Sequence, residues 1–101
     1  MQNYNIRFGT NINHQYNYEQ AKRLLITFFG AVEFTQATYS RDYTADLADT
    51  TASTYLNFYA RITTSLPFSR LRQMLKEAEQ QMGRTAERKA QGIIDADFDI
   101  L

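Results

Sequence analysis

Apolar side chains recur at helical spacing in the segment that ends at Gly30. Positions three, four and seven residues apart lie on one face of an α-helix, so this spacing predicts an amphipathic helix of about three turns. Asn17 followed by Gln20 resembles a capping box and places the start of the helix at Asn17. The apolar stripe consists of Ala21, Leu24, Leu25 and Phe28.

A second stripe with the same spacing lies between Pro67 and Gly83. Proline suits the first turn of a helix and glycine commonly follows its last residue, so these two residues bound a second amphipathic helix. Its stripe consists of Leu71, Leu75, Ala78 and Met82.

Alternation with period two predicts strands in four other segments. They cover residues 4–8, 32–39, 55–62 and 93–100. The third segment has the clearest division into an apolar and a polar face. Its apolar face carries Leu56, Phe58, Ala60 and Ile62, and its polar face carries Tyr55, Asn57, Tyr59 and Arg61.

The order of these elements is β-α-β-β-α-β, with a long polar loop expected from Arg41 to Thr54. Two split βαβ units in this order predict an α+β fold of the ferredoxin-like class. Such a sandwich has one antiparallel sheet with two helices on one face. We expect a single domain over residues 1–101.

Three carboxylates, Asp95, Asp97 and Asp99, alternate with apolar residues at the end of the last predicted strand. Carboxylates two residues apart on a strand lie ~6.6 Å from each other and repel by ~2.5 kcal/mol at an effective dielectric constant of ~20. A hard divalent cation such as Mg²⁺ would neutralise them. A solvated strand whose charges deter edge-to-edge pairing is the alternative.

The composition limits the classes of function. Lys+Arg and Asp+Glu number 11 each, so no global field attracts nucleic acid or a membrane, and we expect neither as a partner. The absence of cysteine excludes disulfides and thiolate metal sites. Residues 1–5 do not form a basic or apolar leader, and the longest apolar run, residues 24–26, is too short to span a bilayer. These features predict a soluble cytoplasmic protein.

Four short motifs follow one another along the chain: Phe8-Gly9-Thr10-Asn11, Tyr55-Leu56-Asn57, Ala78-Glu79 with Met82-Gly83-Arg84, and Asp97-Phe98-Asp99-Ile100-Leu101. Together they resemble the folate-pathway family of 6-hydroxymethyl-7,8-dihydropterin pyrophosphokinases, whose pattern runs Gly-Ser-Asn, Tyr-Leu-Asn, Ile-Glu with Leu-Gly-Arg, and Asp-Leu-Asp-Ile. The resemblance covers essentially the whole chain. It also implies a ferredoxin-like core.

The resemblance implies that Asp97 and Asp99 hold Mg²⁺ ions on ATP while pyrophosphate is transferred to the pterin. Arg84 matches an arginine of the family pattern and is the candidate catalytic, phosphate-binding residue; an exposed helix-terminal charge is its alternative. Arg88 is a second candidate for binding ATP. The cluster that it forms with Arg84 and Lys89 could also bind RNA, but Glu87 within the cluster and the balanced net charge favour a solvated loop.

Three further residues are candidates for binding the substrate. Tyr55 and Asn57 match family residues that stack on and hydrogen-bond the pterin; a half-exposed aromatic ring and a strand-start amide are their alternatives. Glu79 would brace the site from the second helix, or else lie on a solvated face. His14, the single histidine, has no partner spacing typical of a triad or metal site and is expected in a loop.

The chain also departs from the family pattern. Ile94 replaces an arginine expected three residues before the first metal-binding acid, and Gln91 stands where some members have tryptophan. The segment after Tyr43 lacks the family's proline-containing stretch, and the family's further C-terminal region is absent after Leu101. Loss of oriented donors typically costs ~10² or more in rate each, so reduced or lost activity is expected.

The alternative function is a non-catalytic interaction or regulatory module that associates with itself. The end of the chain at Leu101 is expected to leave surface and a sheet edge uncovered, and a homodimer through sheet edges or through adjacent apolar side chains would cover them. Such a dimer could bring Arg84, Arg88 or Lys89 of one subunit toward Asp97 and Asp99 of the other.

Overall fold

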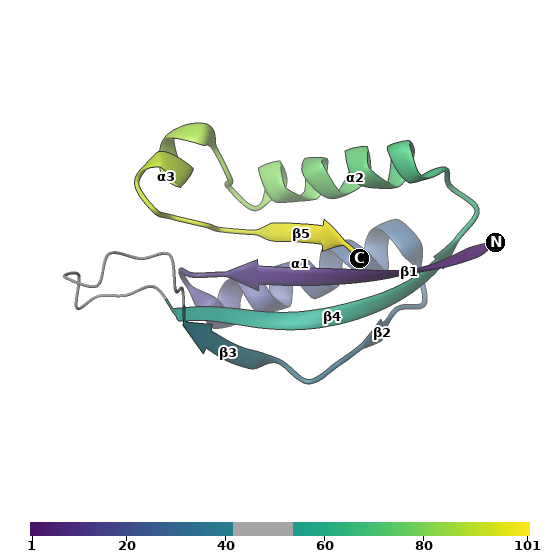
Figure 1. Cartoon of the computed structure of the whole chain (residues 1–101), viewed down its shortest axis with the longest axis horizontal. Helices are drawn as coiled ribbons and strands as arrows, with labels where there is room; N and C mark the ends of the chain where they lie inside the picture. The colour runs from purple at the N-terminus through teal and green to yellow at the C-terminus, as the bar shows by residue number, and fades with distance from the viewer. Residues whose placement is uncertain (42–53) are drawn as a thin grey trace.

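The alternating segments of the sequence form one antiparallel sheet of five strands in the computed structural model, which describes residues 1–41 and 54–101 (Figure 1). The strands are β1 (Gln2–Thr10), β2 (Glu33–Phe34), β3 (Thr38–Arg41), β4 (Thr54–Thr64) and β5 (Asp97–Ile100). The helices of the described residues are α1 (His14–Phe29), α2 (Phe68–Gln81) and the short α3 (Ala86–Ala90).

Strand β1 lies between β4 and β5 in the sheet, whose order is β2-β4-β1-β5, with β3 also paired to β4. Its register with β4 runs from Gln2 opposite Thr64 to Thr10 opposite Leu56. On its other side β1 pairs with the whole of β5. The polar face of β4 and the acids of β5 are therefore separated by one strand only.

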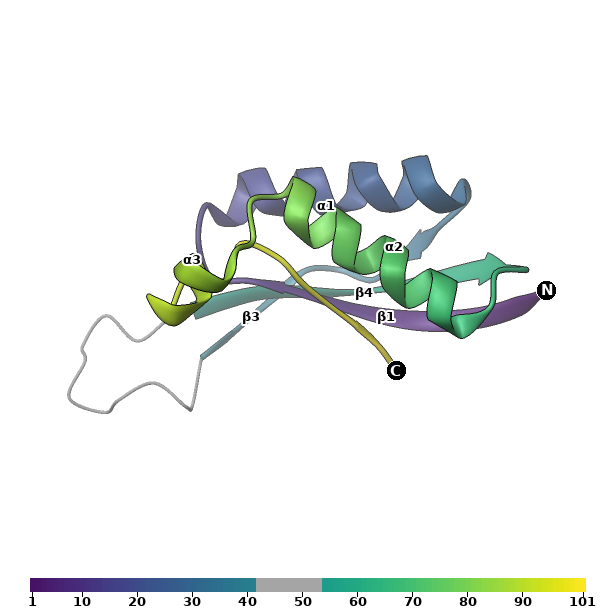
Figure 2. The same ribbon diagram turned by 90° about the horizontal axis from the view of Figure 1, so that it is seen from above.

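Helices α1 and α2 lie on the same face of the sheet, as Figure 2 shows. Most of each apolar stripe is buried against it: Ala21 and Leu25 from α1, and Leu71, Leu75 and Ala78 from α2. The other predicted stripe residues, Leu24, Phe28 and the C-cap residue Met82, are partly buried against the same core. The sheet contributes alternate residues of β1 and β4 to the same core, as period two requires. No described helix of the chain is long and apolar enough to cross a membrane.

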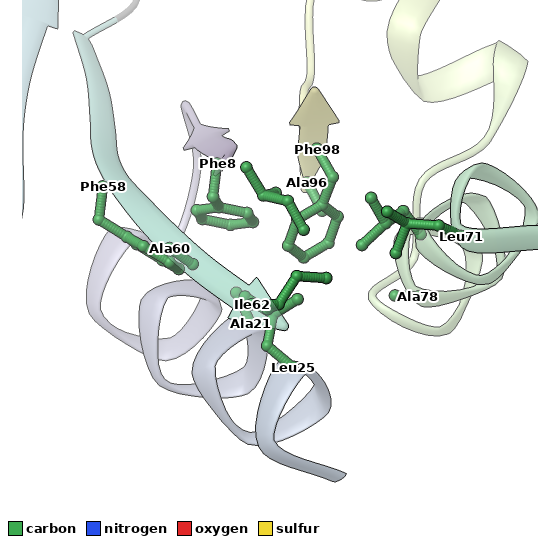
Figure 3. Packing of buried hydrophobic residues seen from close by; sticks show 12 residues of the cluster. Phe8, Ala21, Leu25, Phe58, Ala60, Ile62, Leu71, Ala78, Ala96 and Phe98 are labelled. Atoms are coloured by element: carbon green, nitrogen blue, oxygen red, sulfur yellow. The ribbon is translucent and has the colours of Figure 1, made fainter. Parts of the chain in front are cut away.

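Three phenylalanine rings join the central strands of the core (Figure 3). The ring centroid of Phe8 on β1 lies 5.1 Å from that of Phe58 on β4 and 5.0 Å from that of Phe98 on β5. Phe8 is completely buried. Because Phe98 stands between Asp97 and Asp99, this ring contact fixes the strand that carries the acids.

The first helix begins earlier than the capping box predicts. It starts at His14 after Asn13, whose backbone is left-handed (φ 45°), and Asn17 lies buried within it. The amide Nδ2 of Asn17 donates to the carbonyl of Ile12 (2.8 Å) and to Oγ1 of Thr10 (3.2 Å) instead of capping a helix. The prediction that His14 lies in a loop was also wrong, since His14 is the first residue of α1. Its Nε2 lies 2.7 Å from the carbonyl oxygen of Thr54 at the start of β4.

Two strand predictions need correction. Residues 32–39 form two pieces, β2 and β3, both paired with β4, rather than one strand. The last strand covers only Asp97–Ile100, because residues 93–96 approach the sheet as an irregular segment. The expected loop lies largely outside the described residues, and its two ends, Arg41 and Thr54, belong to β3 and β4.

Pro67, expected in the first turn of the second helix, is instead the N-cap of α2, one residue before that turn.

The segment after α2 is more ordered than expected. The predicted solvated loop around Arg88 is the helix α3, which Thr85 caps by accepting a hydrogen bond from the backbone N–H of Arg88 at 3.1 Å. A threonine N-cap supplies an acceptor for an otherwise unpaired N–H, which helps such a short helix to form.

Candidate functional site

A pocket of about 300 Å³ lies between α2 and β5. Strand β5 contributes Asp97 and Asp99 to its lining, and helix α2 contributes Glu79. Arg84 reaches the same pocket from the turn that follows α2. The structure thus gathers four of the predicted site residues at one edge of the sheet.

Arg84 is held among acids by a single nitrogen. Its NH1 lies 3.0 Å from Oδ1 of Asp97 and 3.1 Å from Oε2 of Glu79, and it also donates to the carbonyl of Ala96 at 3.1 Å. Its side chain is mostly buried. A guanidinium in these contacts balances the charge of Asp97 and connects α2 with β5.

Glu79 and Arg84 also cover the outer backbone edge of β5. The N–H of Leu101 donates to the carbonyl of Asn5 on β1, so the backbone groups of alternate residues, Ala96 and Phe98, point away from β1. Glu79 Oε2 accepts a hydrogen bond from the N–H of Phe98 at 2.8 Å. Arg84 donates a hydrogen bond to the carbonyl of Ala96. The edge that the predicted dimer would use is therefore partly occupied by side chains of the same chain.

Glu79 is not the solvated helix residue of the alternative interpretation, because its side chain is only 12% exposed. Burial raises the pKa of Glu79, while the hydrogen bond from Phe98 and the charge of Arg84 oppose that rise. The nearby carboxylates Asp97 and Asp99 raise the pKa further. Glu79 therefore braces the acid-bearing strand from α2.

Asp99 is paired with an arginine of β1, the strand next to β5. It lies directly opposite Arg7 of β1, and NH2 of Arg7 approaches Oδ2 of Asp99 to 2.8 Å. The hydrogen bond to Asp99 raises the pKa of Arg7. Arg7 did not emerge from the sequence, where a single cation in the first strand carries no sign of a partner near the end of the chain.

Asp95 does not belong to the row of acids that the sequence predicted. It precedes β5, is 5% exposed, and accepts two hydrogen bonds from Arg88, one from Nε and one from NH2, each 2.8 Å long. This hydrogen bonding raises the pKa of Arg88. The two-bond geometry of the pair anchors α3 to the segment that leads into β5.

An arginine of the same chain thus stands beside each of the three acids of the terminal motif. Asp95 has Arg88, Asp97 has Arg84, and Asp99 has Arg7. The repulsion calculated for bare carboxylates is relieved without the second subunit that we expected to supply Arg84 or Arg88.

The predicted pterin-binding residues lie over Gly9 on the open face of the sheet. A Cβ atom at Gly9 would lie 3.0 Å from Oδ1 of Asn57 and 3.5 Å from Cδ1 of Tyr55. The amide of Asn57 is oriented by Ser40 on β3, whose Oγ accepts a hydrogen bond from Nδ2 at 2.7 Å. Gly9 is therefore required for the close approach of both side chains to β1.

The register connects this place with the acids. Gly9 is opposite Asn57 on one side and opposite Asp97 on the other. Neighbouring strands lie about 4.8 Å apart, so the backbones of Asn57 and Asp97 are about 10 Å apart, with the buried Gly9 between them. A small planar ligand against Tyr55 and Asn57 would lie on the same open face of the sheet as the acids.

Asn11, at the end of the first motif, holds the segment that leads into β5. Its Nδ2 donates to the carbonyl of Gly92 at 2.8 Å, and its Oδ1 accepts the N–H of Ile94 at 2.7 Å. The hydroxyl of Thr10 adds a hydrogen bond to the carbonyl of Ile94 at 3.2 Å. The sequence marked these residues as part of a motif, but this role depends on a contact between distant segments.

The acids suit a metal ion that brings further ligands with it. Among the residues that the structure describes, no group of three or more histidines, cysteines or carboxylates could hold a metal by itself. Asp97 and Asp99 each engage one oxygen with an arginine, and the second oxygen of each has no described hydrogen bond. Such a donor set fits a magnesium ion that completes its coordination with water and phosphate.

The comparison with protein families identifies the family of the chain. The family model for 7,8-dihydro-6-hydroxymethylpterin-pyrophosphokinase (HPPK) matches residues 5–101. The chain belongs to the HPPK family. The search of curated proteins gave no match.

The pocket also contains two cations that the sequence patterns did not single out. Arg72 and Lys76 lie one turn apart on the outer side of α2 and line the same pocket as Asp97 and Asp99. Their spacing of four residues was the available signal, because it places both on one helix face. Lys89 lies in an adjoining pocket with Lys76, whereas Arg88 lines neither.

Gly9→Ala is expected to weaken pterin binding about tenfold, because the added methyl group would displace the amide of Asn57 from its contact with Ser40. The measurement is a fluorescence titration with 6-hydroxymethylpterin. Asn5→Ala, on the same strand and away from Tyr55, is the matched control and should bind as the wild type does. Equal affinity of the Gly9 variant would show that the ligand does not use this surface.

Proposed function

We propose that this HPPK-family chain binds magnesium and ATP in the pocket between α2 and β5 and a hydroxymethylpterin against Tyr55 and Asn57, and transfers pyrophosphate from ATP to the pterin. The observation that carries the proposal is the row Asn57, Gly9 and Asp97 across β4, β1 and β5. This row supports a pterin site beside the phosphate site.

Magnesium ions would be held by Asp97 and Asp99, and their charge would offset that of the phosphates. Arg72 and Lys76 supply positive charge on the α2 side of the pocket. Arg84, the proposed catalytic cation, holds Asp97 in place and can turn its remaining nitrogens toward phosphate. Arg88 would act on ATP only indirectly, through Asp95 and the path of the chain into β5.

The pterin would stack on the ring of Tyr55 and exchange hydrogen bonds with the amide of Asn57. Ser40 would set which end of that amide faces the ligand, since it already accepts from Nδ2. Oδ1 of Asn57 lies over Gly9, and it would accept a hydrogen bond from the amino group of a pterin beside it.

The proposed architecture is ferredoxin-like, with the second strand of the β-α-β-β-α-β order divided into β2 and β3 and with α3 added before β5. The strand order, the antiparallel register and the position of α1 and α2 on one face support this class. In this arrangement Tyr55 and Asn57 lie over Gly9 on the open face of the sheet. Glu79, Arg84 and the acids of β5 lie around the pocket beside α2.

We expect the transfer reaction to be slow. Two of the arginines near the acids, Arg84 and Arg88, are already engaged with carboxylates, and Ile94 offers no guanidinium where the family pattern has one. Transfer of pyrophosphate depends on preorganised positive charge around the triphosphate, which is reduced here.

Calorimetric titration with magnesium and a non-hydrolysable ATP analogue tests the nucleotide site. The wild type should bind the analogue only with Mg²⁺, and Asp97→Asn should weaken binding at least about tenfold because a metal-binding charge is lost. Glu77→Gln removes a carboxylate from the exposed face of α2 and is the matched control. Unchanged affinity after Asp97→Asn would refute the assignment of the metal site.

The transfer step is tested by following AMP release from ATP with and without 6-hydroxymethyl-7,8-dihydropterin. Release that depends on the pterin, with formation of the pterin pyrophosphate, supports the proposed reaction. Binding of both ligands without such release would support the second candidate function instead.

That second candidate is a non-catalytic module that forms a homodimer. The pairing of each terminal acid with an arginine of the same chain favours the non-catalytic part of this candidate, because the acids are then stable without metal. Light scattering over a wide concentration range should then report twice the mass of 11.8 kDa. A dimer through the β5 edge should strengthen when Glu79 is removed from that edge, whereas a dimer through the open face should not change.

A further inference from the structure

Arg7 points from β1 onto the open face of the sheet, where its neighbours in register are Tyr59 on β4 and Asp99 on β5. The ion pair with Asp99 is the contact that connects it with the proposed metal site. The two side chains are 50% and 41% exposed, so water reaches both partners. An exposed ion pair of this kind is weak and can exchange its partners.

The charges around the site are nearly balanced before any ligand arrives. Three carboxylates, Asp97, Asp99 and Glu79, are in contact with two guanidinium groups, Arg7 and Arg84. A divalent cation that approaches alone therefore meets a small net negative charge. At Asp99 it also meets the positive charge of Arg7 within a few ångströms.

Arg7 and Arg84 differ in what removing them would do. Arg84 is mostly buried and also holds Glu79 and the carbonyl of Ala96, so its loss would disturb the strand itself. Arg7 has Asp99 as its described side-chain partner. The charge of Arg7 can therefore be changed with little effect on the position of β5.

We propose that Arg7 is an internal counter-cation that occupies Asp99 in the metal-free protein and makes metal binding depend on nucleotide. This inference rests on the proposed function, because it concerns the same two acids. A metal ion with ATP brings phosphate charge that compensates for Arg7, whereas the metal ion alone must displace it. Arg7 is thus a positioning residue that sets metal affinity without being a ligand.

The test is a titration with Mn²⁺ alone, followed through the relaxation rate of water protons. Mn²⁺ prefers the same oxygen ligands as Mg²⁺. Arg7→Ala should bind Mn²⁺ about tenfold more tightly than the wild type, because one positive charge beside a divalent cation is removed. Arg7→Gln, which keeps most of the side chain, should show the same gain and guards against a folding defect of the alanine variant.

Arg61→Ala is the matched control. Arg61 lies on the same open face, opposite Asn5 and Glu33 rather than beside Asp99, and its removal changes the net charge equally. It should bind Mn²⁺ within about twofold of the wild type. Adding Asp99→Asn to Arg7→Ala should cancel the gain.

Equal gains for Arg61→Ala and Arg7→Ala would refute the inference, because they would report net charge alone. Unchanged Mn²⁺ affinity in both Arg7 variants would also refute it. If the wild type still bound the magnesium complex of the ATP analogue in that case, the proposed function would stand without this role for Arg7. Absence of binding to Mn²⁺ and to the magnesium–analogue complex in every protein would refute both.

Discussion

Phe8→Ala is expected to lower the free energy of unfolding by about 3–5 kcal/mol. Phe8 is fully buried, and its ring packs between those of Phe58 and Phe98, with centroids about 5 Å away on each side. Truncation would remove the buried surface, leave a cavity and break both ring contacts. Urea denaturation followed by circular dichroism measures the change.

Phe68→Ala provides the comparison, since the same side chain is 53% exposed at the start of α2. Its effect should stay within about 0.5 kcal/mol. Phe8→Ala should also weaken binding of the magnesium–analogue complex, because Phe98 lies between Asp97 and Asp99. A loss of less than about 1 kcal/mol at Phe8 would mean that β5 is not held by this ring cluster.

Glu79→Ala is expected to lower the free energy of unfolding by about 2 kcal/mol, whereas Glu79→Gln should cost less. The alanine variant leaves the N–H of Phe98 without its acceptor and Arg84 without one carboxylate. Glutamine keeps a carbonyl oxygen for Phe98 and loses only the charge. Equal losses in the two variants would show that the ion pair with Arg84, and not the strand cap, is what matters.

Comparison of the wild type with Glu79→Gln gives a pH dependence of stability with a defined sign. Burial raises the pKa of Glu79 above its ordinary value of 4.5, so the folded protein binds the proton more tightly than the unfolded chain does. The stabilising effect of protonation is fully present below 4.5 and is lost as the pH rises through the raised folded-state pKa. The stability of the wild type should therefore fall relative to Glu79→Gln over this interval, and a rise would contradict the direction of the shift.

Much of the fold follows from local pattern. The apolar stripes that predicted two helices are buried in α1 and α2, and the alternation from Leu56 to Ile62 describes the core face of β4. These predictions succeed because burial of one helix stripe or one strand face is a property of consecutive residues. The errors lie at boundaries. Asn17 is a residue type that commonly caps helices, but its amide donates to Thr10 and Ile12 instead. This contact depends on where the preceding strand ends.

The sequence by itself determined the family motifs and the order of the elements that carry them, and so brought Asp97, Asp99, Tyr55 and Asn57 to attention. Tertiary structure decided how these acids are neutralised. Arg7 and Asp99 are 92 positions apart, and nothing local relates them until β1 and β5 pair. The same holds for the capping of Phe98 by Glu79 and for the holding of Ile94 by Asn11. Period and composition report which face of a segment is buried, but a partner across the sheet is set by register, which only the folded chain fixes.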